Sequence, residues 1–286
     1  MKISDILSMG RPTLSFEVFP PKTKDLYDSV EHAVEEIAEL KPDFMSVTYG
    51  AGGGTSDFTA KIAADIQKKH NVTTLAHLTC VSSTREKVEK QAGLLKAEGI
   101  ENILALRGDL PEGGALSPDY KYASQLISDL KSKGDFCIGG ACYPEGHVES
   151  RTIKEDIYYL KEKVDAGLSF LTTQMFFDNS IMYKFLYKIR EAGITVPVVA
   201  GIMPVTNANQ IKRILSLSGT YLPQRFKSIV DRFGDNPKAM EQAGIAYSTE
   251  QIIDLIANGV NAIHVYTMNK PHIAAGIQKS LSEIMK

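Results

Sequence analysis

Eight short apolar runs recur along the chain, and a stretch of helical spacing follows each of them. The runs show little alternation of apolar and polar positions, which is typical of strands buried on both faces of a parallel sheet. Their starts lie roughly thirty residues apart until one longer gap before the last, a pattern that indicates repeated strand–helix units. The predicted strands are 14–19, 44–49, 74–80, 102–109, 137–143, 170–177, 197–203 and 262–268.

The segments between these runs carry apolar residues on one helical face, as in 28–40 and 56–69. Residues that favour helix ends flank them. The predicted start signals are Thr84, Thr152 with Glu155 as a capping box, Thr206 or Asn207, Thr249 and Pro271, and the predicted stops are Gly99 and Gly259.

Eight such units favour a closed (β/α)₈ barrel in a single domain, 1–286, over the alternative of an open doubly wound sheet. The chain has 286 residues, and a barrel typically needs about 250. The long gap before the last strand predicts an extra helical segment over 222–233. The glycine-rich stretch 50–55 lacks the full dinucleotide spacing, so it is either a phosphate-binding turn or a flexible connection.

Composition narrows the classes of protein. The formal net charge of −2 argues against a general nucleic-acid binder. No signal peptide and no apolar run of about 20 residues is seen, so we expect no membrane association. Cys80, Cys137 and Cys142 form no paired motif, which suits a reducing cytoplasm and indicates barrel-wall residues. No strong metal-binding spacing occurs, and no metal site is predicted.

Polar residues interrupt the apolar runs near their C-terminal ends, where barrel enzymes place their chemistry. Glu17 would be costly to bury as a charge, and desolvation is expected to raise its pKa, which suits a general acid. The alternative is a structural glutamate with a buried partner. Asp109 ends the fourth run, and Arg107 either pairs with it or faces a ligand phosphate. Tyr49 and Tyr266 are further polar groups at these ends.

Other side chains in this set suit a flat ligand. His77 is expected to bind or to support the wall rather than to transfer protons. Tyr143 and His147 can stack on a planar ring or hydrogen-bond to it. Gln174 can form hydrogen bonds with the edge of a heterocycle or, alternatively, with backbone groups at the end of the strand ladder. The residues alone indicate a barrel enzyme for a planar ligand, with acid–base or redox chemistry.

The same residues lie in segments that closely resemble the bacterial methylenetetrahydrofolate reductases. The segments run in order along nearly the whole chain, so the resemblance is specific. They are SFEVFPP (15–21), SVTYG (46–50), AHLTC (76–80), ALRGDLP (105–111), YPEGH (143–147), KVDAG (163–167), TQMFFD (173–178), GIMPV (201–205) and VYTMN (265–269).

The resemblance implies a (β/α)₈ barrel that binds FAD without a dinucleotide-binding domain. It implies reduction of 5,10-methylenetetrahydrofolate to 5-methyltetrahydrofolate by ping-pong hydride transfer through FAD. The electron donor would be NADH, NADPH or an electron-donating partner protein. A homo-oligomer is expected, and a C-terminal regulatory domain is not.

The resemblance also implies roles for individual residues. Glu17 matches the acid that helps to open the folate ring, and Asp109 matches the acid near flavin and pterin. Gln174 matches the amide that contacts the pterin, and Gln210 and Lys270 match further substrate-binding positions. The implied cofactor-binding positions are Thr48, His77, Arg107, Gly108, Asp109, Tyr122, Ala141, Tyr143, His147, Asp156 and Lys163.

Two positions depart from the enteric pattern. Ile214 replaces a phenylalanine that packs on the ligands, so stacking there should be weaker. Lys270 replaces an arginine near the folate tail and cannot form a bidentate fork with a carboxylate. Two alternatives stay open: a flavin-free pterin-binding methyltransferase barrel, and a non-catalytic partner subunit. The joint presence of Glu17, Asp109 and Gln174 argues against the second.

Overall fold

A closed barrel of eight parallel strands forms the centre of the computed structural model, which describes residues 1–21, 23–49, 56–109 and 117–286. Each strand pairs with its neighbours in chain order, and the last pairs with the first. The α/β class and the closed barrel are therefore confirmed, and the open sheet is excluded. The strands are β1 (Thr13–Val18), β2 (Phe44–Val47), β3 (Thr73–Thr79), β4 (Asn102–Leu106), β5 (Cys137–Cys142), β6 (Phe170–Thr173), β7 (Val198–Ile202) and β8 (Ala262–Tyr266).

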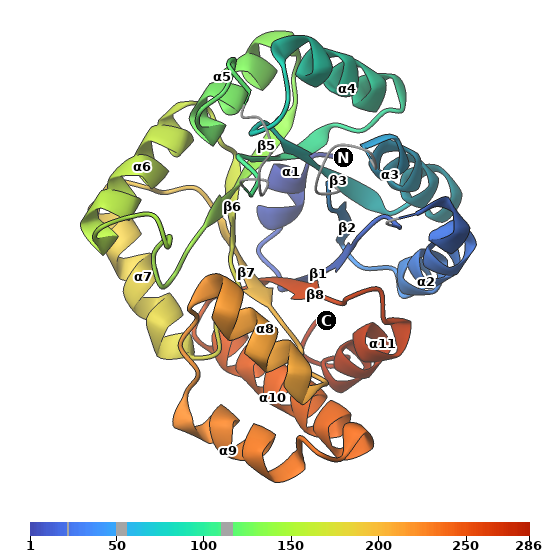
Figure 1. Ribbon diagram of the computed structural model, residues 1–286, viewed down its shortest axis with the longest axis vertical. Helices are drawn as coiled ribbons and strands as arrows, with labels where there is room; N and C mark the ends of the chain where they lie inside the picture. The colour runs from blue at the N-terminus through green and yellow to red at the C-terminus, as the bar shows by residue number, and fades with distance from the viewer. Residues whose placement is uncertain (22, 50–55, 110–116) are drawn as a thin grey trace.

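Helices surround the barrel, and α8, α9 and α10 extend beyond it on one side (Figure 1). The extra helical segment predicted before the last strand is confirmed as α9. The helices are α1 (Ile3–Leu7), the 3₁₀ turn η1 (Lys24–Leu26), α2 (Tyr27–Glu39), α3 (Ser56–His70), α4 (Arg85–Ala97), α5 (Ala123–Lys133), α6 (Ile153–Asp165), α7 (Asn179–Glu191), α8 (Ala208–Ser218), α9 (Gln224–Phe233), α10 (Pro237–Ala257) and α11 (Pro271–Ser280).

Several helix starts follow the predicted signals. The Thr84 hydroxyl accepts a hydrogen bond from the Lys87 backbone N–H at 3.2 Å. The Thr152 hydroxyl accepts one from the Glu155 N–H at 3.1 Å. The Glu155 carboxylate, however, accepts from the Arg151 N–H and not from that of the cap residue Thr152. The reciprocal hydrogen bond of the capping box therefore lies one residue earlier than predicted. Both threonines satisfy donors that the helix itself leaves unpaired.

The predicted start at Thr249 is wrong. Thr249 lies inside α10, where its hydroxyl donates to the Ile245 carbonyl at 2.8 Å. The helix begins twelve residues earlier, where Asn236 caps it and Pro237 occupies the first turn. At the start of α8, the cap is Asn207 and not Thr206.

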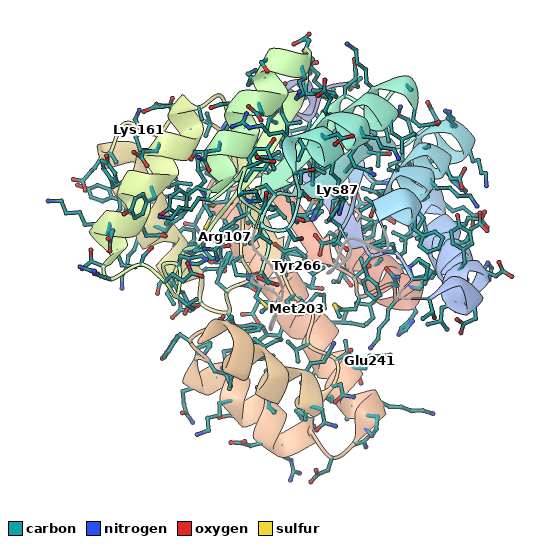
Figure 2. All side chains as sticks on the ribbon, turned by 45° about the horizontal axis from the view of Figure 1, so that its top comes forward. Lys87, Arg107, Lys161, Met203, Glu241 and Tyr266 are labelled. Carbon is teal, nitrogen blue, oxygen red and sulfur yellow. The ribbon has the colours of Figure 1, made fainter. Side chains whose placement is uncertain are left out.

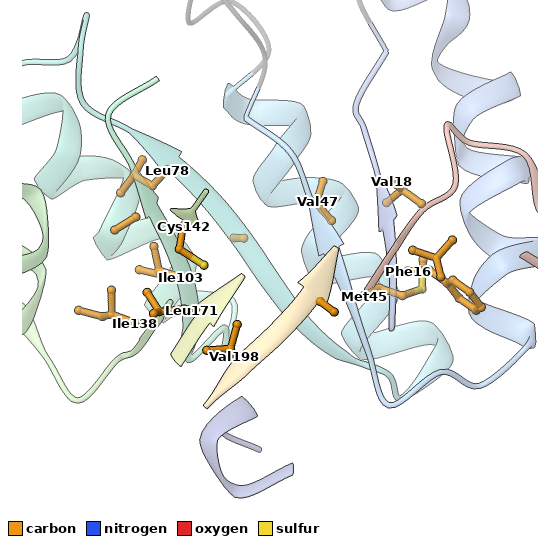
Figure 3. Close-up of a cluster of buried hydrophobic side chains, with 14 of the residues drawn as sticks. Phe16, Val18, Met45, Val47, Leu78, Ile103, Ile138, Cys142, Leu171 and Val198 are labelled. Atoms are coloured by element: carbon orange, nitrogen blue, oxygen red, sulfur yellow. The ribbon is translucent and has the colours of Figure 1, made fainter. Parts of the chain in front are cut away.

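Strand alternation separates two hydrophobic cores. Phe16, Val18, Met45 and Val47 belong to the larger core between the strands and the outer helices (Figure 3). Side chains at the alternate strand positions point into the barrel, where they form a smaller apolar cluster. Glu17 occupies one of these inward-facing positions on β1, so its carboxyl group lies inside the barrel.

The short helix α1 seals the N-terminal end of the barrel. Ile3 and Ile6 are buried against the interior cluster, which includes Phe44 and Phe170. The Asn102 side chain fixes this helix by accepting a hydrogen bond from the Ile3 N–H at 2.8 Å. Sequence analysis did not predict α1, because five residues are too few to show a helical period. With one end sealed, ligands have access from the opposite, C-terminal end.

Two helical glycines give a matched test of the packing beside β7. A Cβ at Gly244 in α10 would overlap the backbone carbonyl of Val205, whereas a Cβ at Gly93 in α4 would meet open space. We expect Gly244→Ala to lower the free energy of unfolding by about 1–3 kcal/mol, as overpacking does. Gly93→Ala should raise it by about 0.5–1 kcal/mol, because alanine favours helix. Urea unfolding of both variants measures the difference, and a stabilised Gly244→Ala variant would contradict the packing described here.

Candidate functional site

A cavity of about 1150 Å³ opens at the C-terminal ends of the strands. Its wall takes residues from the ends of β1 to β8, because parallel strands all finish at this side of the barrel. Arg107, Met203 and Tyr266 belong to this wall and lie near the centre of Figure 2, whereas Lys161 and Glu241 lie at the periphery. Ligand pockets commonly measure about 300–1,000 Å³, so this cavity has room for a large cofactor or for two ligands.

The structure brings all but two of the candidate residues to this cavity. The residues that line it are Glu17, Thr48, His77, Arg107, Gly108, Asp109, Tyr122, Ala141, Tyr143, His147, Asp156, Lys163 and Gln174. They come from six strands and the segments that follow them. The glycine-rich stretch 50–55 lies outside the described residues.

Gln210 and Lys270 are not part of the cavity wall. Both contact Thr206, which follows β7. The Gln210 side-chain oxygen accepts from the Thr206 N–H at 3.1 Å, and the Lys270 ammonium donates to the Thr206 hydroxyl at 3.2 Å. Ile214 also lies away from the wall, buried with Phe177 and Phe226 in a third hydrophobic cluster formed with α9 and α10.

Glu17 lies at the floor of the cavity with its side chain 21% exposed. Its Oε2 atom is 3.3 Å from the Ser46 hydroxyl, 3.6 Å from His77 Nε2 and 3.8 Å from His264 Nε2. Burial acts to raise the pKa of Glu17, but His264, His77 and Ser46 stabilise the carboxylate and outweigh burial. The pKa is therefore lowered, and the prediction that desolvation would raise it is wrong.

His77 is the nearest polar neighbour of Glu17 on β3. Burial, at 7% exposure, lowers the pKa of His77 to about 4, so the ring is neutral at physiological pH. Among the described residues, its Nε2 atom has no hydrogen-bond partner. A buried polar atom of this kind usually requires a partner, and its place in the cavity wall lets a ligand supply one.

Arg107 pairs with Glu149, a partner that sequence analysis did not name. Its two terminal nitrogens donate to the two carboxylate oxygens of Glu149, each at 2.6 Å. The hydrogen bond with Glu149 raises the pKa of Arg107 and lowers that of Glu149. Of the two predicted partners for Arg107, Asp109 is thus not the one observed; it is exposed at the cavity rim.

The wall beyond β5 combines an aromatic pair with a buried amine. The Tyr143 and His147 rings meet edge to face, with centroids 4.6 Å apart. Burial and the charge of Asp109 raise the pKa of Tyr143 to about 12, so its phenol stays protonated. Lys163 donates to the Ala141 carbonyl at 2.7 Å, and burial lowers its pKa. These groups offer donors and a ring face to a ligand.

Gln174 and Tyr266 have their own bonds at the cavity wall. The Gln174 side-chain oxygen accepts from the Met175 N–H at 3.1 Å, so the amide also has the local structural role that sequence analysis left open. The Tyr266 hydroxyl donates to the Thr173 carbonyl at 2.6 Å and links β8 to β6. A side chain at Gly201, on the strand between them, would overlap this phenol.

Sequence analysis missed several polar residues of the site. Ser46 and His264 lie beside Glu17, and Lys87, Glu149 and Arg151 line the outer cavity. The alternation of side chains along a strand could have indicated Ser46 and His264. Ser46 pairs with Glu17 in register, and His264 lies two residues before Tyr266 and so faces the same side of β8. The other three lie on a helix or in loops, for which no such rule exists.

The remaining chemistry is limited. Cys80, Cys137 and Cys142 are free and buried, and burial raises the pKa of Cys80 to about 11 and that of Cys142 to about 12. The prediction of barrel-wall residues is confirmed for Cys137 and Cys142, which lie on β5, and Cys80 directly follows β3. Across the described part of the chain, no group of three or more metal-binding side chains occurs. In the same part, none of the helices has the length and apolar character to cross a membrane.

Comparisons with known proteins agree with this geometry. The family model described as methylenetetrahydrofolate reductase matches residues 2–282. The chain is 35% identical over 272 residues to the 5,10-methylenetetrahydrofolate reductase of Escherichia coli, covering 95% of this chain and 91% of that one. It is 35% identical over 298 residues to methylenetetrahydrofolate reductase (NADH) 1 of Arabidopsis thaliana, covering 99% of this chain. It spans about half, 50%, of the length of that plant relative.

A solved structure shows the same fold. A protein from Clostridium thermocellum, described as binding two copies of 5-methyl-5,6,7,8-tetrahydrofolic acid, superposes with a TM-score of 0.67. The match covers 99% of both chains at 14% sequence identity. At this identity the likeness concerns the barrel alone.

Proposed function

Since the chain belongs to the methylenetetrahydrofolate reductase family, we propose that it reduces 5,10-methylenetetrahydrofolate to 5-methyltetrahydrofolate with FAD as its cofactor. The observation that carries this proposal is the position of Glu17, Asp109 and Gln174. These three residues come from β1 and from the segments after β4 and β6, and they line one cavity. The flavin-free methyltransferase barrel and the non-catalytic subunit are the competing candidates.

The cavity fits FAD in size and in chemistry. A dinucleotide needs cations for its phosphates, and the presence of Arg107 in the cavity wall supports this part of the proposal. The unpartnered Nε2 of His77 and the protonated phenol of Tyr143 suit the polar edge of a flavin ring. Bound FAD would supply the hydride-carrying ring, and the protein would supply orientation and electrostatics.

Glu17 has the proton-transfer role in this proposal. Opening of the folate's five-membered ring breaks the bond between the methylene carbon and N10, and N10 gains a proton while N5 becomes an iminium cation. Glu17 donates that proton from the cavity floor. The neighbours of Glu17 lower its pKa, so the proposal requires a bound folate, by excluding water from the cavity, to favour the protonated carboxyl group. Asp109 then stabilises the cation by its charge.

We also propose that the barrel, residues 1–286, is sufficient for this reaction as a single domain. The bacterial relative supports this, because 91% of its length is matched. The donor in the proposal is a reduced nicotinamide, and a homo-oligomer is the expected assembly.

A two-stage experiment tests the proposed function. The purified protein should be yellow or should become so on incubation with FAD, and anaerobic NADH or NADPH should bleach the flavin absorbance. Addition of 5,10-methylenetetrahydrofolate should then restore it. A colourless protein that cannot be reconstituted would favour the flavin-free barrel. A flavoprotein whose reduced form folate does not reoxidise would reject the reductase assignment.

The Arg107–Glu149 pair predicts how the cofactor binds. Arg107→Ala should weaken FAD binding about 10- to 100-fold, because charge-assisted bonds to a phosphate are lost. Glu149→Gln should tighten it a few-fold, since the arginine no longer has a competing carboxylate. Quenching of flavin fluorescence measures both affinities.

Riboflavin, which lacks phosphates, serves as the control ligand. Its affinity should be unchanged in both variants. An equal loss of FAD and riboflavin binding by Arg107→Ala would show that the arginine acts on the ring or on the fold instead of on the phosphates.

A further inference from the structure

Three buried polar side chains form a hydrogen-bonded chain below Glu17, inside the barrel. Ser46 Oγ lies 3.3 Å from Glu17 Oε2 and 3.0 Å from His264 Nε2. On the other side of the ring, His264 Nδ1 lies 2.7 Å from Ser15 Oγ. Ser15 in turn donates to the Ile263 carbonyl at 2.9 Å. The chain therefore runs without interruption from the cavity floor to the wall of the barrel.

This chain occupies an otherwise apolar part of the barrel. His264 is 2% exposed and stacks on Phe44, with ring centroids 5.6 Å apart. Ser15 and Ser46 are fully buried. Burying three polar groups is costly even when they are bonded, and apolar residues of similar size would fill the space. Their arrangement in a line that ends at Glu17 suggests a role in the chemistry of that carboxyl group.

The hydrogen bonds define where the protons lie. A backbone carbonyl only accepts, so when the single hydroxyl proton of Ser15 lies on the Ile263 carbonyl, the Ser15 oxygen accepts from Nδ1 of His264. In this tautomer, which a relay through Nε2 requires, Nδ1 carries a proton. Nε2, which faces Ser46, is the atom that can gain or lose one.

Two arrangements of the same bonds differ by one proton. In the first, His264 is an imidazolium that donates through Nε2 to Ser46, and Ser46 donates to the Glu17 carboxylate. In the second, Ser46 donates to neutral Nε2, and protonated Glu17 donates to Ser46. The heavy atoms need not move, because the serine hydroxyl both donates and accepts.

We propose that Ser46 and His264 form a proton relay that reloads Glu17 after it has protonated the folate. This inference rests on the proposed reductase function and deepens it. In the relay step, the Nε2–H bond of His264 breaks as a Ser46 O–H bond forms, and the original Ser46 proton moves to Glu17 Oε2. Between turnovers, once the product has left, water in the open cavity protonates Glu17, and the reverse transfer through Ser46 returns a proton to His264 Nε2. The positive charge of the imidazolium and the negative charge of the carboxylate disappear together. His264 and Ser46 are positioning residues, since Glu17 alone reaches the ligand.

The other titratable groups near Glu17 do not form such a path. His77 on β3 is 3.6 Å from Glu17 Oε2, its Nε2 has no hydrogen-bond partner among the described residues, and it is neutral at physiological pH. Tyr266 on β8 meets His264 edge to face, and its hydroxyl is bonded to the Thr173 carbonyl. Burial keeps the pKa of Tyr266 well above its ordinary value.

Ser46→Ala tests the relay, because it removes one hydroxyl and no charge. The rate of folate-driven flavin reoxidation near neutral pH should fall about tenfold, although loss of the Ser46 hydrogen bond raises the pKa of Glu17 and by itself favours the protonated acid. Reduction of the flavin by the nicotinamide donor should be unchanged, which shows that the variant is folded and loaded. If wild-type protein shows no folate half-reaction, the proposed function fails, and not the relay.

A purely electrostatic role gives the opposite result for the rate. Ser46 helps to lower the pKa of Glu17, so loss of the serine would raise that pKa and increase the fraction of Glu17 that carries a proton. An unchanged or higher rate of folate-driven reoxidation near neutral pH would overturn the proposal.

A spectroscopic measurement tests the relay without turnover. In protein labelled with ¹⁵N-histidine, the His264 Nδ1 signal should be that of a protonated nitrogen. At a fixed pH near neutrality, Glu17→Gln should move the Nε2 signal toward the unprotonated value, because the anionic partner is gone. An unprotonated Nδ1 in the wild type, or an Nε2 signal that does not respond to Glu17→Gln, would refute the proton chain.

Discussion

Glu17→Gln is expected to abolish hydride transfer to the folate while flavin reduction by the nicotinamide donor stays near the wild-type rate. A positioned general acid contributes typically 10²–10⁴-fold, so the folate half-reaction should slow by about that factor. The amide is close to the carboxylate in size and can still accept from Ser46, but it holds no transferable proton. The donor half-reaction needs no proton from Glu17, which is why the two halves should separate.

Stopped-flow absorbance of each half-reaction measures this separation. Glu162→Gln is the matched control, because Glu162 also lines the cavity but is exposed on α6, away from the cluster around Glu17. The control should behave like the wild type in both halves. Equal losses in the two half-reactions of Glu17→Gln would mean that Glu17 supports the cavity and is not the acid.

The direction of the Glu17 pKa shows where sequence reasoning reaches its limit. The sequence places a carboxylate in a buried strand, and burial alone raises a pKa. The groups that reverse this effect, Ser46, His77 and His264, come from β2, β3 and β8. No local pattern around Glu17 contains them, so only the closed barrel shows that they meet at one carboxyl group.

The fold was easier to predict than the site, for a physical reason. Each strand is buried on both faces and each helix on one, so both leave a local pattern in the sequence. Contacts between side chains from distant elements leave none. The Arg107–Glu149 pair, 42 residues apart in the chain, is one example, and the seal formed by α1 is another.

The resemblance supplied roles that local chemistry could not. Glu17, Asp109 and Gln174 reach one cavity as that resemblance implies, whereas Gln210 and Lys270 meet at Thr206 outside its wall. Their part in substrate binding stays a prediction. It requires the loop after β7 to approach the ligand, because neither side chain lines the cavity.

Asp109→Asn is expected to raise the midpoint potential of the bound flavin and to slow folate reduction by about 10²-fold or more. In the proposed mechanism the carboxylate disfavours negative charge on a reduced flavin and stabilises the cation that forms on the folate. Preorganised charges of this kind are commonly worth 10²–10³ in rate. Glu149 holds both terminal nitrogens of Arg107, so the arginine meets Asp109 only through their charges. The charge of Asp109 also acts across the cavity, because after burial it is the next cause that raises the pKa of Tyr143.

Dye equilibration gives the potential, and stopped-flow absorbance gives the two half-reactions. Glu162→Gln again removes one charge from the cavity border and should leave the potential unchanged. A slower folate half-reaction with an unchanged potential would place the charge of Asp109 near the pterin and not beside the flavin. Since the substitution removes a charge and leaves the shape of the side chain, a change in either quantity reports electrostatics and not packing.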